Sequence, residues 1–447
     1  MSKDKLTDYD STTPSNNTDI GGISVAEGML PSAVNNSIRE LTKQLGAFAD
    51  GTDGIDVLSL ADDDASHAIK LQAPSAVTAD TTFTLPDGDG ASGQAMITDG
   101  AGTLSWAAPY GNRNLIINGA MNISQRNGAS SSTLTSSQVY YLDRFFAVED
   151  TDGTMTIQQS STSPTDFQYS ALLTTGTADT SLAATQICYV GQKLEGLNVA
   201  HLNWGTANAK TLTLSFYVRS SLTGTFGGAF ANAAFNRSYP FTYSISSADT
   251  WEYKTITVAG DTTGTWPTDN TASIQVFWGL GVGSTYSGTA GAWVGSGNIS
   301  ATGATNVIGT ASATFYLTGV QLELGDTATP FEHRSFGDEL ARCQRYYWEN
   351  GGLDYTMHGA GMNLNTTTSD IALHLPVTMR SSPTVTSNAL GIQSGATTYA
   401  VSSISNIKAN TNVLYLRATV SGVTAGYGAV LVNNNNASGY LRYDAEL

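Results

Sequence analysis

The sequence predicts a mostly β protein with a short helix near its N-terminus. Charged residues make up 13% of the chain, about half of the roughly 25% that is usual in globular domains. Gly, Ser, Thr and Asn take their place, and these residues favour strands and tight turns. Apolar residues alternate with polar ones over long stretches after residue 112, which is typical of half-buried strands. Ahead of them lies one apolar stripe with helical spacing.

The composition also bounds the function. At 447 residues the chain should hold several domains, since a domain averages about 150 residues. A net charge of −17 argues against DNA or RNA as a ligand, because phosphate binding needs clustered Lys and Arg. The same charge disfavours docking on an anionic membrane, and no run of about 18 apolar residues predicts membrane insertion. Cys188 and Cys343 show neither a metal-site spacing nor a disulfide framework.

Within residues 1–60, the spacing predicts a helix over 31–48. Pro31 suits the first turn of a helix, and an Asp-Gly pair at residues 50–51 should end it. Apolar residues spaced four, three, four and three form a heptad seam, the pattern by which helices pair with copies of themselves. An amphipathic helix packed on its own domain is the alternative. The seam residues are Val34, Ile38, Leu41, Leu45 and Phe48.

Residues 61–111 predict a β-rich shaft. Short β-like pieces at 82–85, 95–98 and 103–106 are separated by Gly and Asp turns. Each piece is too short for a core of its own, because an isolated hairpin is marginally stable in water. Several apolar groups would then stay in water unless three intertwined copies shared a core. A flexible linker is the alternative.

Residues 112–335 predict a β-sandwich of jelly-roll type. Period-two alternation with Gly-, Asn- and Ser-rich connections is typical of antiparallel sheets packed face to face. A domain of about 220 residues suits this architecture. The alternating apolar sets are Leu212, Leu214, Phe216 and Val218, then Ile274, Val276, Trp278 and Leu280, then Val320, Leu322 and Leu324.

A linking helix is predicted over 336–349 and a β tip domain over 350–447. Ser335 can cap the helix, with Asp338 in the capping-box position. In the tip domain, alternation over 371–379 predicts a strand, and Pro376 should place it at an edge or a bulge. Four consecutive asparagines at 433–436 are typical of a loop tip.

Three segments resemble tail fibre proteins of tailed bacteriophages. The first includes TDIGGISVAEGMLPSAVNNSIRELTKQLGAF, which is similar to the attachment region of many such fibres. The second, SGQAMITDGAGTLSW, resembles their shaft. The third is the pair NLIINGAMNISQRN and VQLELGDTATPFEHRSFGDELARCQRYYWE, which brackets a sandwich domain found in many phage fibre and receptor-binding proteins. The last hundred residues resemble no family that we can name.

This resemblance implies an elongated homotrimeric fibre in the virion tail, made in the host cytoplasm and released by lysis. Residues 1–50 would attach to phage tail structural proteins, and the distal β domains would bind a host surface glycan or another outer-surface receptor. The resemblance brings no catalytic residues with it. Two alternatives remain open: a fibre-borne polysaccharide depolymerase, and a structural adaptor that holds a separate receptor-binding protein.

The residues themselves predict neither catalysis nor a cofactor. Glycan hydrolysis uses paired carboxylates at defined separations, and no motif pairs them here. The densest acidic cluster, residues 62–64, is more simply a solvated turn, and the five histidines lack a zinc spacing. No phosphate-cradling glycine loop is present. We therefore expect no catalytic residue and no metal site.

Two sets of residues are candidates for glycan binding. Five of the seven tryptophans lie within residues 204–293, and aromatic faces stack on sugar rings. Trp266 and Trp293 stand in turn-like stretches where the rings can be exposed; burial in the core is the alternative. In the tip, amide and phenol groups suit sugar hydroxyls, although a plain hairpin tip is the alternative. These tip candidates are Asn433, Asn434, Asn435 and Tyr440.

Two charged segments are interpreted as structural. Asp143 and Arg144 lie inside the aromatic run of residues 140–146, and Glu332 and Arg334 flank His333 ahead of the linking helix. A buried charge needs a partner, so we expect each to be paired within the fold.

Overall fold

The structure is a computed structural model, and it divides into two compact units, residues 1–109 and residues 110–447. Strands dominate it, which confirms the expected mostly β class. Among the described residues, no helix has the length and apolarity needed to cross a membrane. The described residues are 19–20, 23–24, 31–49, 57–61, 68–72, 82–88, 95–98, 101–107 and 112–447.

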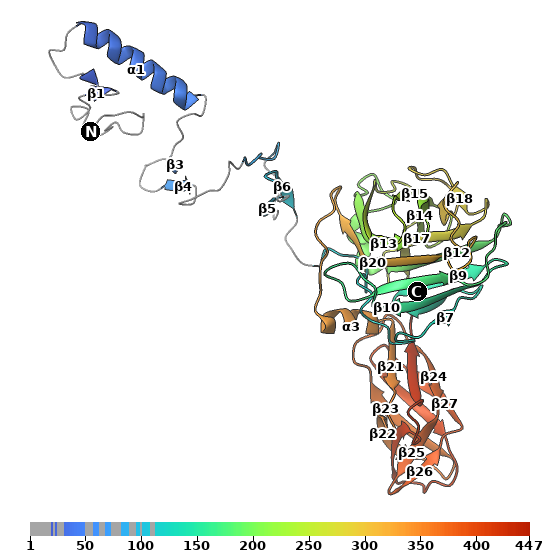
Figure 1. Cartoon of the computed structure of the whole chain (residues 1–447). Helices are drawn as coiled ribbons and strands as arrows, with labels where there is room; N and C mark the ends of the chain where they lie inside the picture. Colours follow the sequence, from blue (N-terminus) through green and yellow to red (C-terminus); the bar gives the residue numbers. More distant parts are fainter. Residues whose placement is uncertain are drawn as a thin grey trace. The chain divides into compact units, whose positions relative to one another are not determined.

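In the first unit, the described residues form one helix and short antiparallel hairpins (Figure 1). The predicted helix 31–48 corresponds to α1, Pro31–Ala49. Most of the predicted attachment region, and the acidic cluster at 62–64, lie outside the described residues. The hairpins are β1 (Asp19–Ile20) with β2 (Ile23–Ser24), β3 (Val57–Ala61) with β4 (Ala68–Gln72), and β5 (Ala95–Thr98) with β6 (Leu104–Ala107).

Several apolar side chains of the first unit are exposed among those whose burial the structure describes. Along α1, Val34, Ile38 and Leu45 are exposed and Leu41 is half-buried, whereas the Phe48 side chain lies outside the described residues. In the predicted shaft, Phe83, Leu85 and Met96 are exposed. The backbone of Leu104 donates to Thr84, 2.8 Å away, which ties β6 to the preceding segment. Hydrogen bonds therefore order these hairpins, but one chain does not cover their apolar groups.

Residues 112–335 form a sandwich of two six-stranded antiparallel sheets, named here the β13 sheet and the β17 sheet (Figure 1). This confirms the predicted sandwich-like architecture. The β13 sheet has the order β16 (Glu252–Val258), β13 (Leu212–Ser220), β20 (Thr314–Leu324), β11 (Ser170–Thr175), β10 (Met155–Ser160) and β7 (Ser132–Thr133). The β17 sheet has the order β15 (Ser238–Ile245), β14 (Gly224–Asn232), β17 (Ala272–Val282), β12 (Ile187–Glu195), β9 (Phe145–Asp150) and β8 (Val139–Leu142).

The predicted alternation places one face of each sheet in a shared core. On β13, Leu214 and Phe216 are fully buried, and on β17 Val276 and Trp278 are fully buried against them. Burying an apolar side chain of this size contributes about 1.5–3 kcal/mol. Short elements close the ends of the sandwich: α2 (Gly196–Val199), η3 (Ala200–Leu202), β18 (Ser287–Gly288) and β19 (Ser300–Ala301).

The segment after the sandwich begins with α3, Phe336–Gln344, whose cap forms as predicted: Ser335 Oγ accepts a hydrogen bond from the backbone of Asp338. The predicted helix to residue 349 is too long. Tyr347–Gly351 is strand β21, which pairs with β30 (Tyr440–Asp444). Aromatic residues such as Tyr347 favour a strand once a partner strand is present, and the pattern of residues 336–349 does not reveal that partner.

Two sheets complete the chain around a second core. Strand β23 lies inside its sheet, so the expected edge position is wrong; Pro376 follows the end of the strand and leaves the ladder intact. The small sheet has the order β21, β30 and β24 (Thr384–Asn388). The larger one has the order β26 (Thr397–Ala400), β25 (Leu390–Ser394), β29 (Gly428–Asn433), β22 (Met357–Asn363), β23 (Thr368–His374), β28 (Val413–Thr419) and β27 (Ser403–Ala409).

Buried ion pairs join the sandwich to the segments that follow it. Arg345 pairs with the fully buried Glu195 at 2.6 Å, and Tyr346 donates to the same carboxylate at 2.5 Å. Arg144 pairs with Glu446, and its guanidinium lies 3.5 Å from the Tyr346 ring centroid. Removing one partner of a buried pair typically costs about 3–5 kcal/mol. These contacts give Arg144 the structural role expected from the sequence.

Candidate ligand-binding surfaces

The structure brings together the two tryptophans that were predicted to bind glycan. Trp266 and Trp293 pack edge to face with Trp204, at ring-centroid distances of 4.8 Å (Trp204–Trp266), 5.3 Å (Trp204–Trp293) and 5.5 Å (Trp266–Trp293). Trp266 is only 8% exposed, which agrees with the alternative that this ring belongs to the core. Its turn folds it onto Trp204, and its indole nitrogen donates to the Thr263 carbonyl at 3.1 Å. Trp293 is half-buried, so its role in binding stays a prediction.

Of the three candidate asparagines in the tip, one is buried in the structure and two lie in the loop that follows it. Asn433 is fully buried, and its amide nitrogen donates to the carbonyls of Leu353 and Gly439. Asn433 therefore cannot contact a ligand, and its prediction as a glycan-binding residue is wrong. Asn434 is half-buried and Asn435 is exposed, with a positive φ of 47° at Asn435. Left-handed geometry at an Asn is typical of a hairpin tip.

Tyr440, the remaining tip candidate, is half-buried on β30. The guanidinium of Arg442 lies 3.6 Å from its ring centroid. Arg442 is itself paired with Glu349 at 2.8 Å. One face of the Tyr440 ring is thus occupied by a side chain of the same strand, which reduces the surface available to a sugar.

A hollow on the outward face of the β17 sheet is a better candidate, and none of its residues was predicted. We name it the sheet groove; its volume is about 290 Å³. Phe277 and Tyr189 come from the paired strands β17 and β12, whereas Phe235 and Tyr286 come from the loops after β14 and β17. The lining residues are Ile187, Tyr189, Ala233, Phe235, Gln275, Phe277, Tyr286 and Ile299.

Aromatic rings follow one another across this face. Tyr189 and Phe277 lie 5.3 Å apart edge to face, Phe277 and Phe235 lie 6.1 Å apart, and Phe235 and Tyr286 lie 6.2 Å apart. Gly191 gives the rings room: a Cβ there would lie 2.6 Å from the Val276 carbonyl oxygen and 2.9 Å from Phe277 Cδ1. Small residues between large rings thus keep the face hollow rather than filled.

The polar groups of the sheet groove are neutral. Burial, together with the neighbouring Tyr286, raises the pKa of Tyr189 from 10.0 to about 12, so this phenol is protonated at neutral pH. Neither the Tyr189 nor the Tyr286 hydroxyl has a hydrogen-bond partner within the part of the chain that the structure describes. The Gln275 amide donates to the Asn232 carbonyl at 2.9 Å. The groove therefore offers apolar ring faces beside free phenol hydroxyls.

A signal for this groove was present in the sequence. The outward positions of β17 carry Gln275, Phe277 and Gly279, whereas those of β13 carry Thr213, Ser215 and Tyr217. A phenylalanine among small residues on a face that should meet water marks an apolar hollow. The inward alternation that contains Trp278 says nothing about its outward neighbour Phe277.

Within the part of the chain that the structure describes, neither a metal-binding group nor a reactive thiol is present. The described residues contain no group of three or more His, Cys, Asp or Glu side chains that could hold a metal ion. Cys188 and Cys343 are both buried, and burial raises the pKa of both thiols. A reactive cysteine needs an exposed thiolate, so neither thiol is a candidate nucleophile.

Comparisons with known proteins identify no family. No family model and no curated protein matches the chain. Among solved structures, the enzymatically active domain of tailspike protein 4 from bacteriophage CBA120 aligns at 12% identity and a TM-score of 0.25, covering 49% of this chain and 23% of that one. A family 11 carbohydrate-binding module from Clostridium thermocellum aligns at 15% identity and a TM-score of 0.24, covering 46% of this chain and all of that one. Similarity at this level establishes neither a common fold nor a common function.

Proposed function

We propose that this chain is a subunit of a homotrimeric phage tail fibre that binds a host surface glycan during adsorption. Residues 1–50 attach it to tail structural proteins, and the sheet groove contacts the glycan. The protein is made in the host cytoplasm, is released by lysis and resides in the virion tail. The resemblance of the three sequence segments, in their order along one chain, supports this assignment.

The sheet groove is the observation that carries the glycan proposal. A sugar ring presents C–H groups on its faces and hydroxyls at its rim, so it matches stacked aromatic rings beside free polar groups. Phe235 and Tyr286 supply ring surface at the mouth of the groove, and Tyr189 supplies a phenol hydroxyl. The absence of ionised side chains from the lining favours a neutral sugar at this position.

The exposed seam of α1 supports the trimer. Val34, Ile38 and Leu45 share one helical stripe, and all three are exposed in the single chain. Three copies packed along this stripe would remove these side chains from water, which is favourable by about 25 cal/mol per Å² of apolar surface. A trimer would also present three sheet grooves at once, and linked weak sites gain avidity without new contacts.

Calorimetric titration of the full-length protein with host surface oligosaccharides tests the glycan proposal. Replacing Tyr286 or Phe235 with alanine should weaken binding about tenfold or more, since aromatic anchors dominate such sites. Tyr316→Ala is the matched control, because that ring lies on the outward face of the β13 sheet, beside Arg219. Unchanged affinity in both groove variants would remove the groove from the proposal.

We propose binding without cleavage. Incubation of the protein with the same oligosaccharides should release no new reducing ends, because the described residues present no paired carboxylates in the groove. Reducing ends that appear with wild type but not after heat inactivation would instead favour a depolymerase. An adaptor without a binding role predicts normal host adsorption by particles whose fibres carry Tyr286→Ala.

A further inference from the structure

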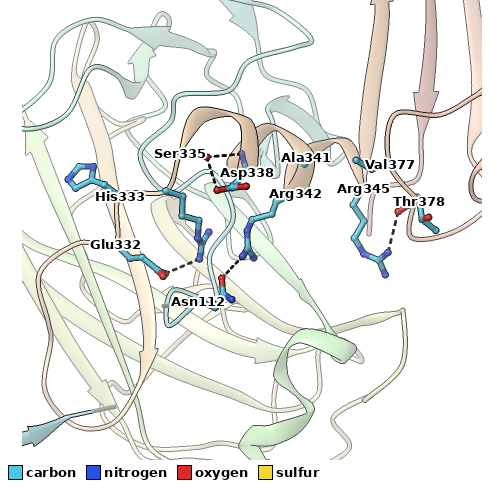
Figure 2. A pocket seen from close by; sticks show the side chains of 11 residues that line it. Asn112, Glu332, His333, Ser335, Asp338, Ala341, Arg342, Arg345, Val377 and Thr378 are labelled. Atoms are coloured by element: carbon cyan, nitrogen blue, oxygen red, sulfur yellow. Dashed lines mark hydrogen bonds and ion pairs between the residues drawn. The ribbon is translucent and has the colours of Figure 1, made fainter. Parts of the chain in front are cut away.

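A second cavity lies beside α3 and differs from the sheet groove in its charge. We name it the α3 cavity; its volume is about 690 Å³. Figure 2 shows Arg342 reaching toward Asn112, and Arg345 reaching toward Thr378. The lining residues are Asn112, Glu332, His333, Arg334, Ser335, Asp338, Ala341, Arg342, Arg345, Val377 and Thr378.

Arg342 differs from the other two arginines of this lining. Arg334 pairs with Glu332 and Glu339, and Arg345 pairs with Glu195. Within the described residues, the guanidinium of Arg342 donates only to the neutral amide oxygen of Asn112, at 2.6 Å. The lining carboxylates are already engaged: Glu332 accepts from the Asn114 backbone at 2.8 Å, and Asp338 accepts from Ser335 Oγ at 2.7 Å. Among the residues that the structure describes, the guanidinium of Arg342 thus has no ion-pair partner.

A row of aromatic rings leads to this cavity along the outward face of the β13 sheet. Its centroid spacings are 5.0 Å (Tyr253–Tyr217), 5.5 Å (Tyr217–Phe167), 5.0 Å (Phe167–Phe331) and 4.9 Å (Phe331–His333). Tyr253 and His333 are exposed at the two ends, and His333 also lines the cavity. The three rings between them are half-buried.

The backbone is shaped to hold this row. Gly319 on β20 has a positive φ of 60°, and a Cβ there would lie 2.8 Å from Phe167 Cζ and 2.9 Å from Tyr217 Cδ2. A side chain at this position would push the two rings apart. The row is therefore a built feature of the sheet rather than a chance gathering of surface rings.

We propose that the aromatic row and the α3 cavity together bind an acidic polysaccharide, with the carboxylate of a uronic acid residue on Arg342. Successive sugar rings lie on the row, where aromatic surface suits their C–H faces. A planar guanidinium matches a carboxylate in two parallel hydrogen bonds. An unpaired cation in a chain of net charge −17 gives the site its selectivity for one charged group. This site is separate from the sheet groove and does not depend on the proposed fibre role.

The test is titration of the full-length protein with oligosaccharides of galacturonate, glucuronate and mannuronate, and with their carboxyl-reduced counterparts. Wild type should bind at least one acidic oligosaccharide about tenfold more tightly than its reduced form. Raising NaCl from 50 to 500 mM should lower the affinity for the acidic oligosaccharide more than the affinity for its reduced form, because salt screens the contact between opposite charges.

Variants separate the two parts of the site. Arg342→Gln should abolish the preference for the acidic form and leave the affinity for the reduced form unchanged. Arg342→Lys keeps the positive charge, so it should keep part of the preference for the acidic form. Tyr217→Ala should weaken both forms equally. Arg219→Gln is the matched control, because Arg219 lies on the same sheet and pairs with Asp249.

Three outcomes would overturn the proposal: no binding of any acidic member, an acidic preference that survives Arg342→Gln, or a loss of acidic binding in the sheet-groove variant Tyr286→Ala. Far-UV circular dichroism of each variant checks that the fold is intact. Tyr286→Ala in the sheet groove should leave these affinities unchanged. A loss of acidic binding in that variant would place the acidic ligand in the groove instead.

Discussion

The two compact units of this chain differ in how far they bury their apolar side chains. In residues 1–109, Ile38 is 58% exposed and Leu85 is 68% exposed. In residues 110–447, rings as large as Trp278 and Phe226 are fully buried between two sheets. Among the side chains whose burial the structure describes, no buried apolar cluster lies in the first unit, whereas the second unit buries its largest rings in the sandwich core.

The difference follows from the number of strands that each unit can combine. The described hairpins of the first unit have strands of two to five residues, and α1 contacts the hairpin of β1 and β2. Two-stranded hairpins of this length are marginal in water, and stability requires more strands or a packed face. The sandwich pairs two six-stranded sheets and thereby excludes water from its interior. In the proposed trimer, other copies of the chain would cover the exposed groups of the first unit, whereas the sandwich has a core of its own.

The largest effect is expected from charges placed on the α1 seam. Ile38→Asp together with Leu45→Asp should convert the proposed trimer into monomers, because a shared apolar seam cannot bury unpaired carboxylates. Sedimentation equilibrium of the full-length protein measures the mass. The control is Asn36→Asp with Thr42→Asp, which adds the same charge at exposed polar positions of α1. Trimers of normal mass in the seam variant would show that α1 packs on another partner.

The sequence predicts those parts of the fold that depend on local periodicity. Alternation identified the inward faces of β13 and β17, and the cap at Ser335 marked the start of α3. The end of α3 was missed because it depends on β30, which is nearly a hundred residues further along the chain. Local pattern cannot reveal a distant strand that competes for Tyr347.

The binding surfaces depend almost entirely on long-range neighbours. The turn-like context around Trp266 left both exposure and burial open, and packing against Trp204 and Trp293 decides for burial. The sheet groove forms only where β12 lies beside β17, so that Tyr189 and Phe277 meet. Composition revealed the supply of aromatic residues, whereas the pairing of strands decides which of them face a ligand.

A smaller effect, confined to the second unit, is expected from its core. Trp278→Ala should lower the stability of residues 110–447 by about 3–5 kcal/mol, because it leaves a cavity between the sheets. The trimer should persist, since the seam is unchanged. Urea unfolding followed by far-UV circular dichroism measures the shift. Trp251→Ala is the control: this ring is half-buried beside Tyr316, so its loss should cost about 1 kcal/mol or less. Equal losses would mean that the β17 sheet core does not carry the stability of this unit.

The smallest effect is expected from raising the pH, which should lower the stability of the second unit and leave the proposed trimer unaffected. Burial raises the pKa of Tyr189 to about 12 from an ordinary value of 10.0, so the fold favours the neutral phenol. The resulting stability is complete below about pH 10 and is lost as the pH rises through 12, because the unfolded chain ionises first. Tyr189→Phe cannot ionise, so its unfolding midpoint in urea should fall less than that of wild type between pH 9 and pH 11.5. The α1 seam contains no tyrosine, so the mass of the trimer should not respond to the same substitution. An equal fall of the urea midpoint in both proteins would mean that the Tyr189 phenol is exposed to water. The sheet groove would then be more open than the burial of Tyr189 indicates.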